Sequence, residues 1–155
     1  MATNVTDQTA QEAQSSLILT CYVGEILLGI NALKVQEVIK TPEHTPVHHA
    51  PDYVIGVMNL RGRIVTLIDL GRRMDANHLE DSSESRIVIV DFMNETVGLL
   101  VDKVSDVITP EESALAEAPS NIRGAKEKFI QGICRCPKGL VAVLDTDRIL
   151  SEREA

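Results

Sequence analysis

The stretch that decides the fold is CYVGEILLGINALKVQEVIKT, residues 21–41, because a related stretch occurs later in the same chain. At a shift of 69 residues, VDFMNETVGLLVDKVSDVITP occupies residues 90–110 with the same spacing of glycine, lysine and valine. The matched positions are Gly29/Gly98, Lys34/Lys103, Val35/Val104, Val38/Val107 and Ile39/Ile108, and Glu37 meets Asp106, so that the charge is kept. Such self-similarity at a fixed shift indicates an internal repeat.

A second pair of segments supports the repeat. Residues 53–74, YVIGVMNLRGRIVTLIDLGRRM, match residues 129–150, FIQGICRCPKGLVAVLDTDRIL, at a shift of 76. Two blocks in the same order predict two copies of one unit of about 65–75 residues. The change of shift places seven extra residues of the second copy in the loop around residues 110–125. Two copies fit a pair of small subdomains better than a solenoid.

Each copy has the residue pattern of short strands. Runs rich in Val and Ile occur at 17–23, 54–55, 64–69 and 86–92, bounded by Gly, Asn, Asp or Arg. We expect hairpin turns at Gly24-Glu25, at residues 93–95, at Gly62 and at Lys138-Gly139. Short strands at regular spacing predict small antiparallel barrels. Because the run IVIV is apolar on both faces, we expect two barrels packed against each other.

Helix signals are few. Residues 31–34 can form one turn before a strand at 35–40. Asp69 and Asp145 can each cap a short helix, at 70–74 and 146–150, by accepting hydrogen bonds from backbone N–H groups. Since these aspartates are equivalent in the repeat, a structural role explains them better than a pair of catalytic carboxylates.

Composition excludes several classes of protein. The 155 residues carry 15 Lys and Arg against 23 Asp and Glu, a net charge of −8, which argues against binding to nucleic acid or to anionic lipid. No apolar run approaches the ~20 residues of a membrane helix. Residues 1–16 lack the features of a signal peptide, so we expect a disordered lead-in and a cytoplasmic protein. Its cysteines, Cys21, Cys134 and Cys136, are then expected to be reduced.

The sequence contains no recognisable catalytic motif, so we expect no enzyme activity and no cofactor. One alternative is a small ligand- or metal-binding module that uses His44, His48 and His49 with the nearby cysteines. The spacing Cys134-Arg-Cys136 is not that of a zinc or redox Cys-x-x-Cys motif, and we therefore expect no metal.

Two features remain open between a structural and a functional role. Residues 53–74 hold four arginines against one aspartate, and Arg61 and Arg63 have no counterpart in the second copy. Arg61 either serves solubility, recognises an acidic or carbonyl-rich partner, or braces a neighbour such as Glu37. Val35 and Val104 either belong to the core or form the floor of an apolar groove in which a helix lies.

The motifs resemble those of a known family. The segments KVQEV at 34–38, TPV at 45–47, GVMNLRGRIV at 56–65 and VGLLVDKVSDV at 97–107 strongly resemble the CheW family of bacterial chemotaxis coupling proteins. The resemblance covers residues 17–150 of the chain. It implies an all-β fold of two five-stranded SH3-like barrels with an intertwined core. Subdomain 1 would span roughly 30–80 plus exchanged strands and subdomain 2 roughly 86–144, followed by a tail at 151–155.

The resemblance also implies a function without catalysis. Family members link the cytoplasmic tips of methyl-accepting chemoreceptors to the regulatory domain of the histidine kinase CheA, and they help to build the receptor array. By this resemblance Val35, Val38 and Val104 contribute to a receptor groove, and Glu37 and Arg61 form a charged pair used in receptor coupling. No residue is assigned to kinase contact. An adaptor of a non-flagellar chemosensory pathway is the alternative within the family.

Overall fold

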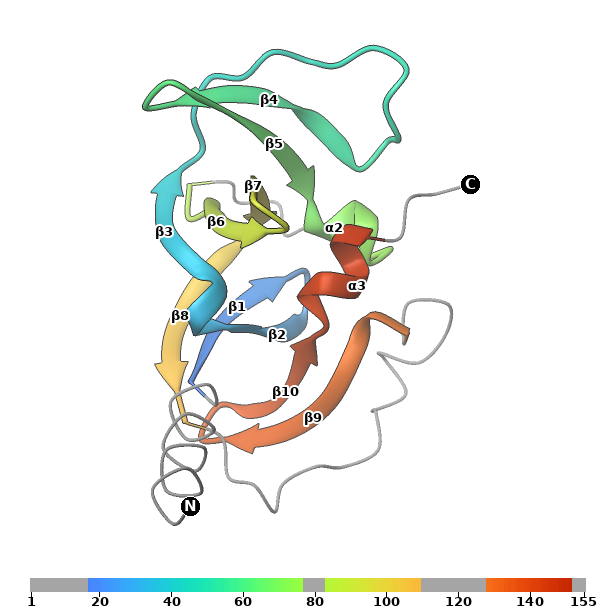
Figure 1. The fold of residues 1–155 in the computed structure, drawn as a ribbon. Helices are drawn as coiled ribbons and strands as arrows, with labels where there is room; N and C mark the ends of the chain where they lie inside the picture. Colours follow the sequence, from blue (N-terminus) through green and yellow to red (C-terminus); the bar gives the residue numbers. More distant parts are fainter. Residues whose placement is uncertain (1–16, 77–82, 110–127, 152–155) are drawn as a thin grey trace, which may run out of the picture.

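The computed structural model describes residues 17–76, 83–109 and 128–151. The expected lead-in at 1–16, the extra residues around 110–125 and all but the first residue of the tail lie outside this part of the chain. Ten strands form two five-stranded sheets (Figure 1), so the predicted all-β fold class is confirmed. No helix within the described residues is long and apolar enough to cross a membrane.

Sheet A has the order β8-β1-β2-β10-β9. Its strands are β8 (Lys103–Ile108), β1 (Ile18–Val23), β2 (Ile26–Asn31), β10 (Gly139–Leu144) and β9 (Ile130–Cys136). Sheet B has the order β3-β6-β7-β5-β4. Its strands are β3 (Val35–Lys40), β6 (Arg86–Phe92), β7 (Glu95–Val101), β5 (Arg63–Asp69) and β4 (Val54–Leu60).

The two sheets exchange strands between the two copies of the repeat. The repeat makes β1 to β5 equivalent to β6 to β10, and replacing each strand by its equivalent turns the order of sheet A into that of sheet B. Each sheet therefore takes the first two strands of one copy and the last three of the other. The parallel pairs β10/β2 and β5/β7 join the copies in each case. Neither copy forms a complete sheet alone, which is the intertwined arrangement that the family resemblance implied.

The local features expected from the sequence are present. The 3₁₀ turn η1 (Ala32–Lys34) precedes β3, and the short helices α2 (Leu70–Arg73) and α3 (Thr146–Ser151) follow β5 and β10. Asp69 caps α2 by accepting from the N–H of Arg72 at 3.2 Å, and Asp145 accepts from the N–H of Arg148 at 3.1 Å. The hairpin turns at Gly24-Glu25, at residues 93–94 and at Gly62 lie where they were predicted. The turn expected at Lys138-Gly139 is instead formed one residue earlier, by Pro137-Lys138, because Gly139 already pairs with Cys136 as the first residue of β10. The strand β4 is longer than the expected pair of residues at 54–55.

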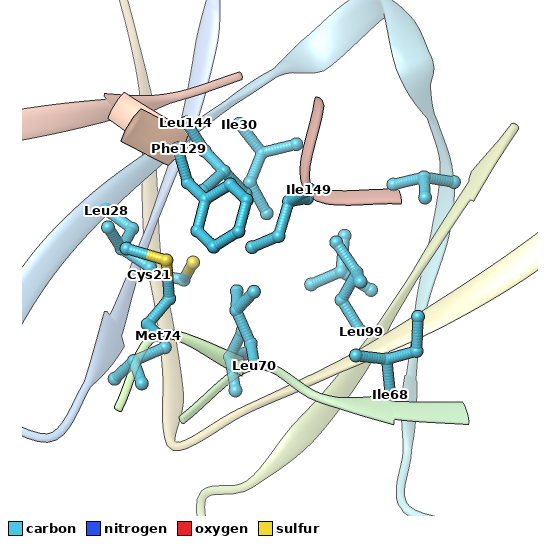
Figure 2. Close-up of a cluster of buried hydrophobic side chains, with 14 of the residues drawn as sticks. Cys21, Leu28, Ile30, Ile68, Leu70, Met74, Leu99, Phe129, Leu144 and Ile149 are labelled. Atoms are coloured by element: carbon cyan, nitrogen blue, oxygen red, sulfur yellow. The ribbon is translucent and has the colours of Figure 1, made fainter. Parts of the chain in front are cut away.

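One large apolar cluster holds the two sheets together. It takes buried side chains from both, and Figure 2 shows Phe129 and Ile149 pointing into its middle, with Leu70 and Leu99 around them. The run at 87–90 in β6 is buried throughout, as its apolar pattern on both faces predicted. Each sheet also has a smaller apolar cluster of its own, formed by residues of that sheet alone. Because most apolar surface is buried between the sheets, their relative orientation is fixed mainly by this shared core.

Three of the four arginines in residues 53–74 lie on the surface, and one does not. Arg61, Arg63 and Arg72 are exposed, but Arg73 is buried in the shared core. Its guanidinium lies 4.6 Å from the ring centroid of Tyr53 and 4.6 Å from that of Phe129. Stacking between two rings stabilises a guanidinium away from water, because the ring faces are negative and the group is weakly hydrated.

Candidate functional site

The structure brings Glu37 and Arg61 together. Arg61 Nη1 donates to Glu37 Oε2 at 2.5 Å, and Nη2 donates to Oε1 at 2.9 Å. Glu37 lies on β3 and Arg61 in the β4–β5 turn, so the pair joins the two edge strands of sheet B. This closes the sheet towards a barrel, and Arg61 braces Glu37, which is one of the roles considered for it.

The turn that carries Arg61 is built for this position. Arg61 has a left-handed backbone conformation with φ of 51°, followed by Gly62 with φ of 84°. The side chain of Asn59 accepts a hydrogen bond of 2.8 Å from the N–H of Gly62 and so ties the turn. The sequence Asn-Leu-Arg-Gly therefore directs the guanidinium across the open end of the sheet.

Electrostatics keep this pair ionised at neutral pH. The hydrogen bond from Arg61, more than simple charge attraction, lowers the pKa of the Glu37 carboxyl. The same hydrogen bond raises the pKa of Arg61. The side chain of Arg61 is 70% exposed and that of Glu37 is 27% exposed, so the arginine covers the carboxylate and faces solvent. This end of the molecule thus carries an exposed guanidinium of fixed position.

A β-bulge in β3 places Val35 and Val38 on one face of the sheet. Val35 is opposite Val90 and Val38 is opposite Val88, with the register shifting at Gln36 between them. Residues directly opposite each other share a face, and the two partners, two residues apart, both belong to the shared core cluster. Simple alternation would have put residues three apart on opposite faces.

The equivalent bulge in β8 does the same for Val104 and Val107. Val104 is opposite Cys21 and Val107 is opposite Leu19, again with a register shift between them. Val107 is 57% exposed, a large value for an apolar residue in a strand. Sequence reasoning aligned Val107 with Val38 but did not include it in the candidate site, although the repeat itself was the signal for it.

We call Val35, Val38, Val104 and Val107 the valine surface. Val35 and Val104 are half-buried and pack against the shared core, whereas Val38 and Val107 are exposed. Figure 1 shows their strands, β3 and β8, following one another along the same side of the molecule. Lys34 and Lys103 precede the two half-buried valines and pair with Asp147 and Glu84. Such a surface suits the apolar stripe of an amphipathic helix.

The alternative metal site receives no support from the geometry. Among residues 17–76, 83–109 and 128–151, no three His, Cys, Asp or Glu side chains are grouped to hold a metal ion. His44 is exposed and lies with its Nδ1 3.1 Å from the carbonyl oxygen of Pro42. Burial raises the pKa of Cys134, and the nearby Cys136 raises it further.

Comparison with known proteins identifies the family. A family profile described as the CheW-like domain matches residues 17–154. Proteins named chemotaxis protein CheW match at similar levels in several bacteria. That of Rhizobium meliloti is 30% identical over 135 residues, 86% of this chain and 87% of the relative. That of Klebsiella aerogenes is 30% identical over 141 residues, 91% of this chain and 84% of the relative.

A solved structure agrees with the computed fold. The scaffolding protein TtCheW from Thermoanaerobacter tengcongensis superposes with a TM-score of 0.78 at 28% identity, and the match covers 89% of each chain. The profile, the relatives and the solved structure each match nearly the whole chain. The chain therefore belongs to the CheW-like family, which comprises non-enzymatic scaffold proteins of bacterial chemotaxis.

Proposed function

We propose that this protein couples the cytoplasmic tip of a methyl-accepting chemoreceptor to the regulatory domain of a CheA-type histidine kinase. It does so in the cytoplasm, as part of a receptor array at the membrane. The relatives from Rhizobium meliloti and Klebsiella aerogenes are named chemotaxis proteins, which favours this role over that of an adaptor in a non-flagellar pathway.

The observation that carries the proposal is the valine surface with the Glu37–Arg61 pair beside it. Exposed Val38 and Val107 offer apolar area that a receptor helix can bury at about 25 cal/mol per Å². Arg61, held by two hydrogen bonds to Glu37, offers a cation of fixed position to a carboxylate or carbonyl on the same helix. Val35, Glu37, Val38, Arg61 and Val104 are thus the proposed receptor-binding residues, with Val107 added to them.

The experiment is co-sedimentation of the purified protein and kinase with receptor-containing membranes. Arg61→Glu places two negative charges side by side, and we expect it to reduce both the sedimented protein and the activation of the kinase by about tenfold or more. Arg63→Glu makes the same charge change on the same hairpin and serves as the matched control. We expect it to reduce sedimentation and kinase activation less than Arg61→Glu does. Unchanged assembly of Arg61→Glu with receptor and kinase would overturn the role of this pair.

A second variant separates the apolar contribution from the charged one. Val38→Asp changes an exposed residue and should leave the melting temperature close to that of the unmodified protein. We expect it to abolish sedimentation with receptor membranes, because a carboxylate would be buried against an apolar helix stripe. If the unmodified protein itself fails to sediment with any chemoreceptor, the proposed function is wrong.

A further inference from the structure

The structure contains a second ion pair that mirrors Glu37–Arg61. Lys138 Nζ lies 2.8 Å from Asp106 Oδ2, and the same ammonium donates a hydrogen bond to the hydroxyl of Ser105. Asp106 is the equivalent of Glu37 in the repeat, and Lys138 follows the position equivalent to Arg61 by one residue. The pair joins β8 to the β9–β10 turn, as Glu37–Arg61 joins β3 to the β4–β5 turn. Sheet A therefore has an ion pair of its own at the equivalent place. We call the two ion pairs, Glu37–Arg61 and Asp106–Lys138, the clasps of sheets B and A.

A buried threonine holds this second pair in place. The hydroxyl of Thr20 donates to the backbone carbonyl of Asp106 at 2.9 Å and accepts from its N–H at 2.9 Å. Thr20 is almost fully buried in β1, opposite the bulge of β8. Its equivalent in the other copy is Ile89, which has no hydroxyl. In sheet A the backbone of the bulge beside Val107 is thus held by two hydrogen bonds to the Thr20 side chain. Ile89 cannot form these hydrogen bonds in sheet B.

The two clasps present different chemistry to a partner. At the sheet B end Arg61 covers Glu37, and the exposed group is mainly a cation. At the sheet A end the side chains of Lys138 and Asp106 are 46% and 54% exposed, so both charges face solvent side by side. A carboxamide matches such a mixed pair, since its oxygen accepts from an ammonium while its nitrogen donates to a carboxylate.

We propose that Lys138 and Asp106, positioned by Thr20, form a second specificity site that contacts the helix bound on the valine surface. The inference rests on the proposed function. The occupant is an amphipathic chemoreceptor helix whose apolar stripe covers Val38 and Val107 and which carries an Asn or Gln side chain at the sheet A end. Continuity supports this occupant, because Asp106 and Val107 are neighbours in β8 just as Glu37 and Val38 are neighbours in β3.

The test measures the affinity of the purified protein for membranes containing one methyl-accepting chemoreceptor. We expect Lys138→Glu and Asp106→Lys each to weaken binding by about five- to tenfold, because each leaves two like charges at the clasp. The reversed pair, Lys138→Asp with Asp106→Lys, should restore affinity to within about threefold, since a carboxamide can rotate to match it. Glu25→Lys, a charge change in the exposed β1–β2 turn, is the control and should leave affinity unchanged.

Thr20 is tested through a conservative pair of variants. Thr20→Val keeps the shape and removes the hydroxyl, so the bulge loses its tie, and we expect affinity to fall by about threefold or more. Thr20→Ser keeps the hydroxyl and should rescue binding. Thermal unfolding of every variant shows whether it is still folded. If Lys138→Glu or Asp106→Lys alone is unstable, the double variant Lys138→Asp with Asp106→Lys still tests the site.

The outcomes distinguish this inference from the proposed function. If the unmodified protein and Arg61→Glu bind receptor membranes equally well, or if neither binds, the proposed function fails. If Arg61→Glu loses binding while Lys138→Glu and Asp106→Lys stay within about twofold of the unmodified protein, only the second site is overturned. A loss with Lys138→Glu that the reversed pair does not restore would overturn the carboxamide contact.

Discussion

Arg73 Nε donates a hydrogen bond of 3.3 Å to the backbone carbonyl of Ile149. The two residues occupy equivalent positions in the repeat, since a shift of 76 relates them. Equivalent positions that touch must lie near the axis relating the two halves. The rings that flank the guanidinium, those of Tyr53 and Phe129, are equivalent to each other as well. Arg73 occupies this position in the first copy, and the buried Ile149 occupies the equivalent position in the second.

Removing this arginine should destabilise the whole fold. Arg73→Ala leaves a cavity between two aromatic rings in the core shared by both sheets, and we expect a loss of about 2–4 kcal/mol in the free energy of unfolding. Arg72→Ala is the matched control, because Arg72 is the exposed neighbour, and its loss should stay below about 1 kcal/mol. Urea denaturation followed by circular dichroism measures both. Equal effects of the two substitutions would contradict the axial role of Arg73.

Replacing either of two equivalent glycines, Gly29 and Gly98, by alanine should destabilise the fold. A Cβ on Gly98 would lie 2.7 Å from Ile87 Cγ2 and 2.7 Å from Leu67 Cδ2, and one on Gly29 would lie 2.5 Å from Ile18 Cγ2. We expect Gly98→Ala and Gly29→Ala each to cost about 1–3 kcal/mol through overpacking. Gly62→Ala meets no atom within 4 Å and should cost about 1 kcal/mol, from its positive φ alone. Thermal unfolding of the three variants checks the order, and a larger loss at Gly62 would show that packing is not the cause.

The Glu37–Arg61 pair should respond to acid in one direction. Because the folded protein lowers the pKa of Glu37, the contribution of the pair is present above the ordinary pKa of glutamate and is lost as the pH falls through the lowered value. We expect Arg61→Gln to return the pKa of Glu37 upwards towards the ordinary value. Titration of the side-chain carboxyl by NMR measures it, and Arg63→Gln, which keeps the pair, should leave the pKa as it is. An unmoved pKa in Arg61→Gln would show that the hydrogen bond from Arg61 is not what lowers it.

The three cysteines should differ in reactivity. Burial, and to a smaller extent Asp102, raises the pKa of Cys21 to about 12, and Cys134 is also buried, whereas Cys136 is half-buried. Since the thiolate is the reactive form, we expect iodoacetamide at pH 8 to modify Cys136 first and Cys21 only after unfolding. Mass spectrometry of timed samples, with Cys136→Ser as the control, gives the order. Early modification of Cys21 in the folded protein would contradict its placement in the core.

Cys21 also predicts a loss of stability in alkali. Its folded pKa is raised above the unfolded one, so its contribution is present below the ordinary thiol value of 9.0 and is lost as the pH rises towards about 12. Cys21→Ala should lose less stability than the unmodified protein over that range. Urea denaturation at several alkaline pH values measures the difference.

The sequence by itself determined the repeat, the turns, the caps and most strand positions. These features depend on a few neighbouring residues: an aspartate before a helical turn, a glycine between two β-branched runs, a run of valine and isoleucine. The family motifs are local in the same way, and for that reason Glu37 and Arg61 could be paired from resemblance before their hydrogen bonds were seen.

Only the tertiary structure decided which strands pair, which arginine is buried and which valines share a face. Equivalent strands of a repeat have similar local sequences, so nothing local shows whether β8 completes its own sheet or the other one. The sequence alone does not distinguish Arg73 from a surface arginine, because the two rings that enclose it, Tyr53 and Phe129, come from different copies of the repeat. A single extra residue in β3 and in β8 reverses the alternation of faces, and bulges of this kind depend on cross-strand partners such as Thr20, far away in sequence. These are long-range contacts, and periodicity along one strand does not contain them.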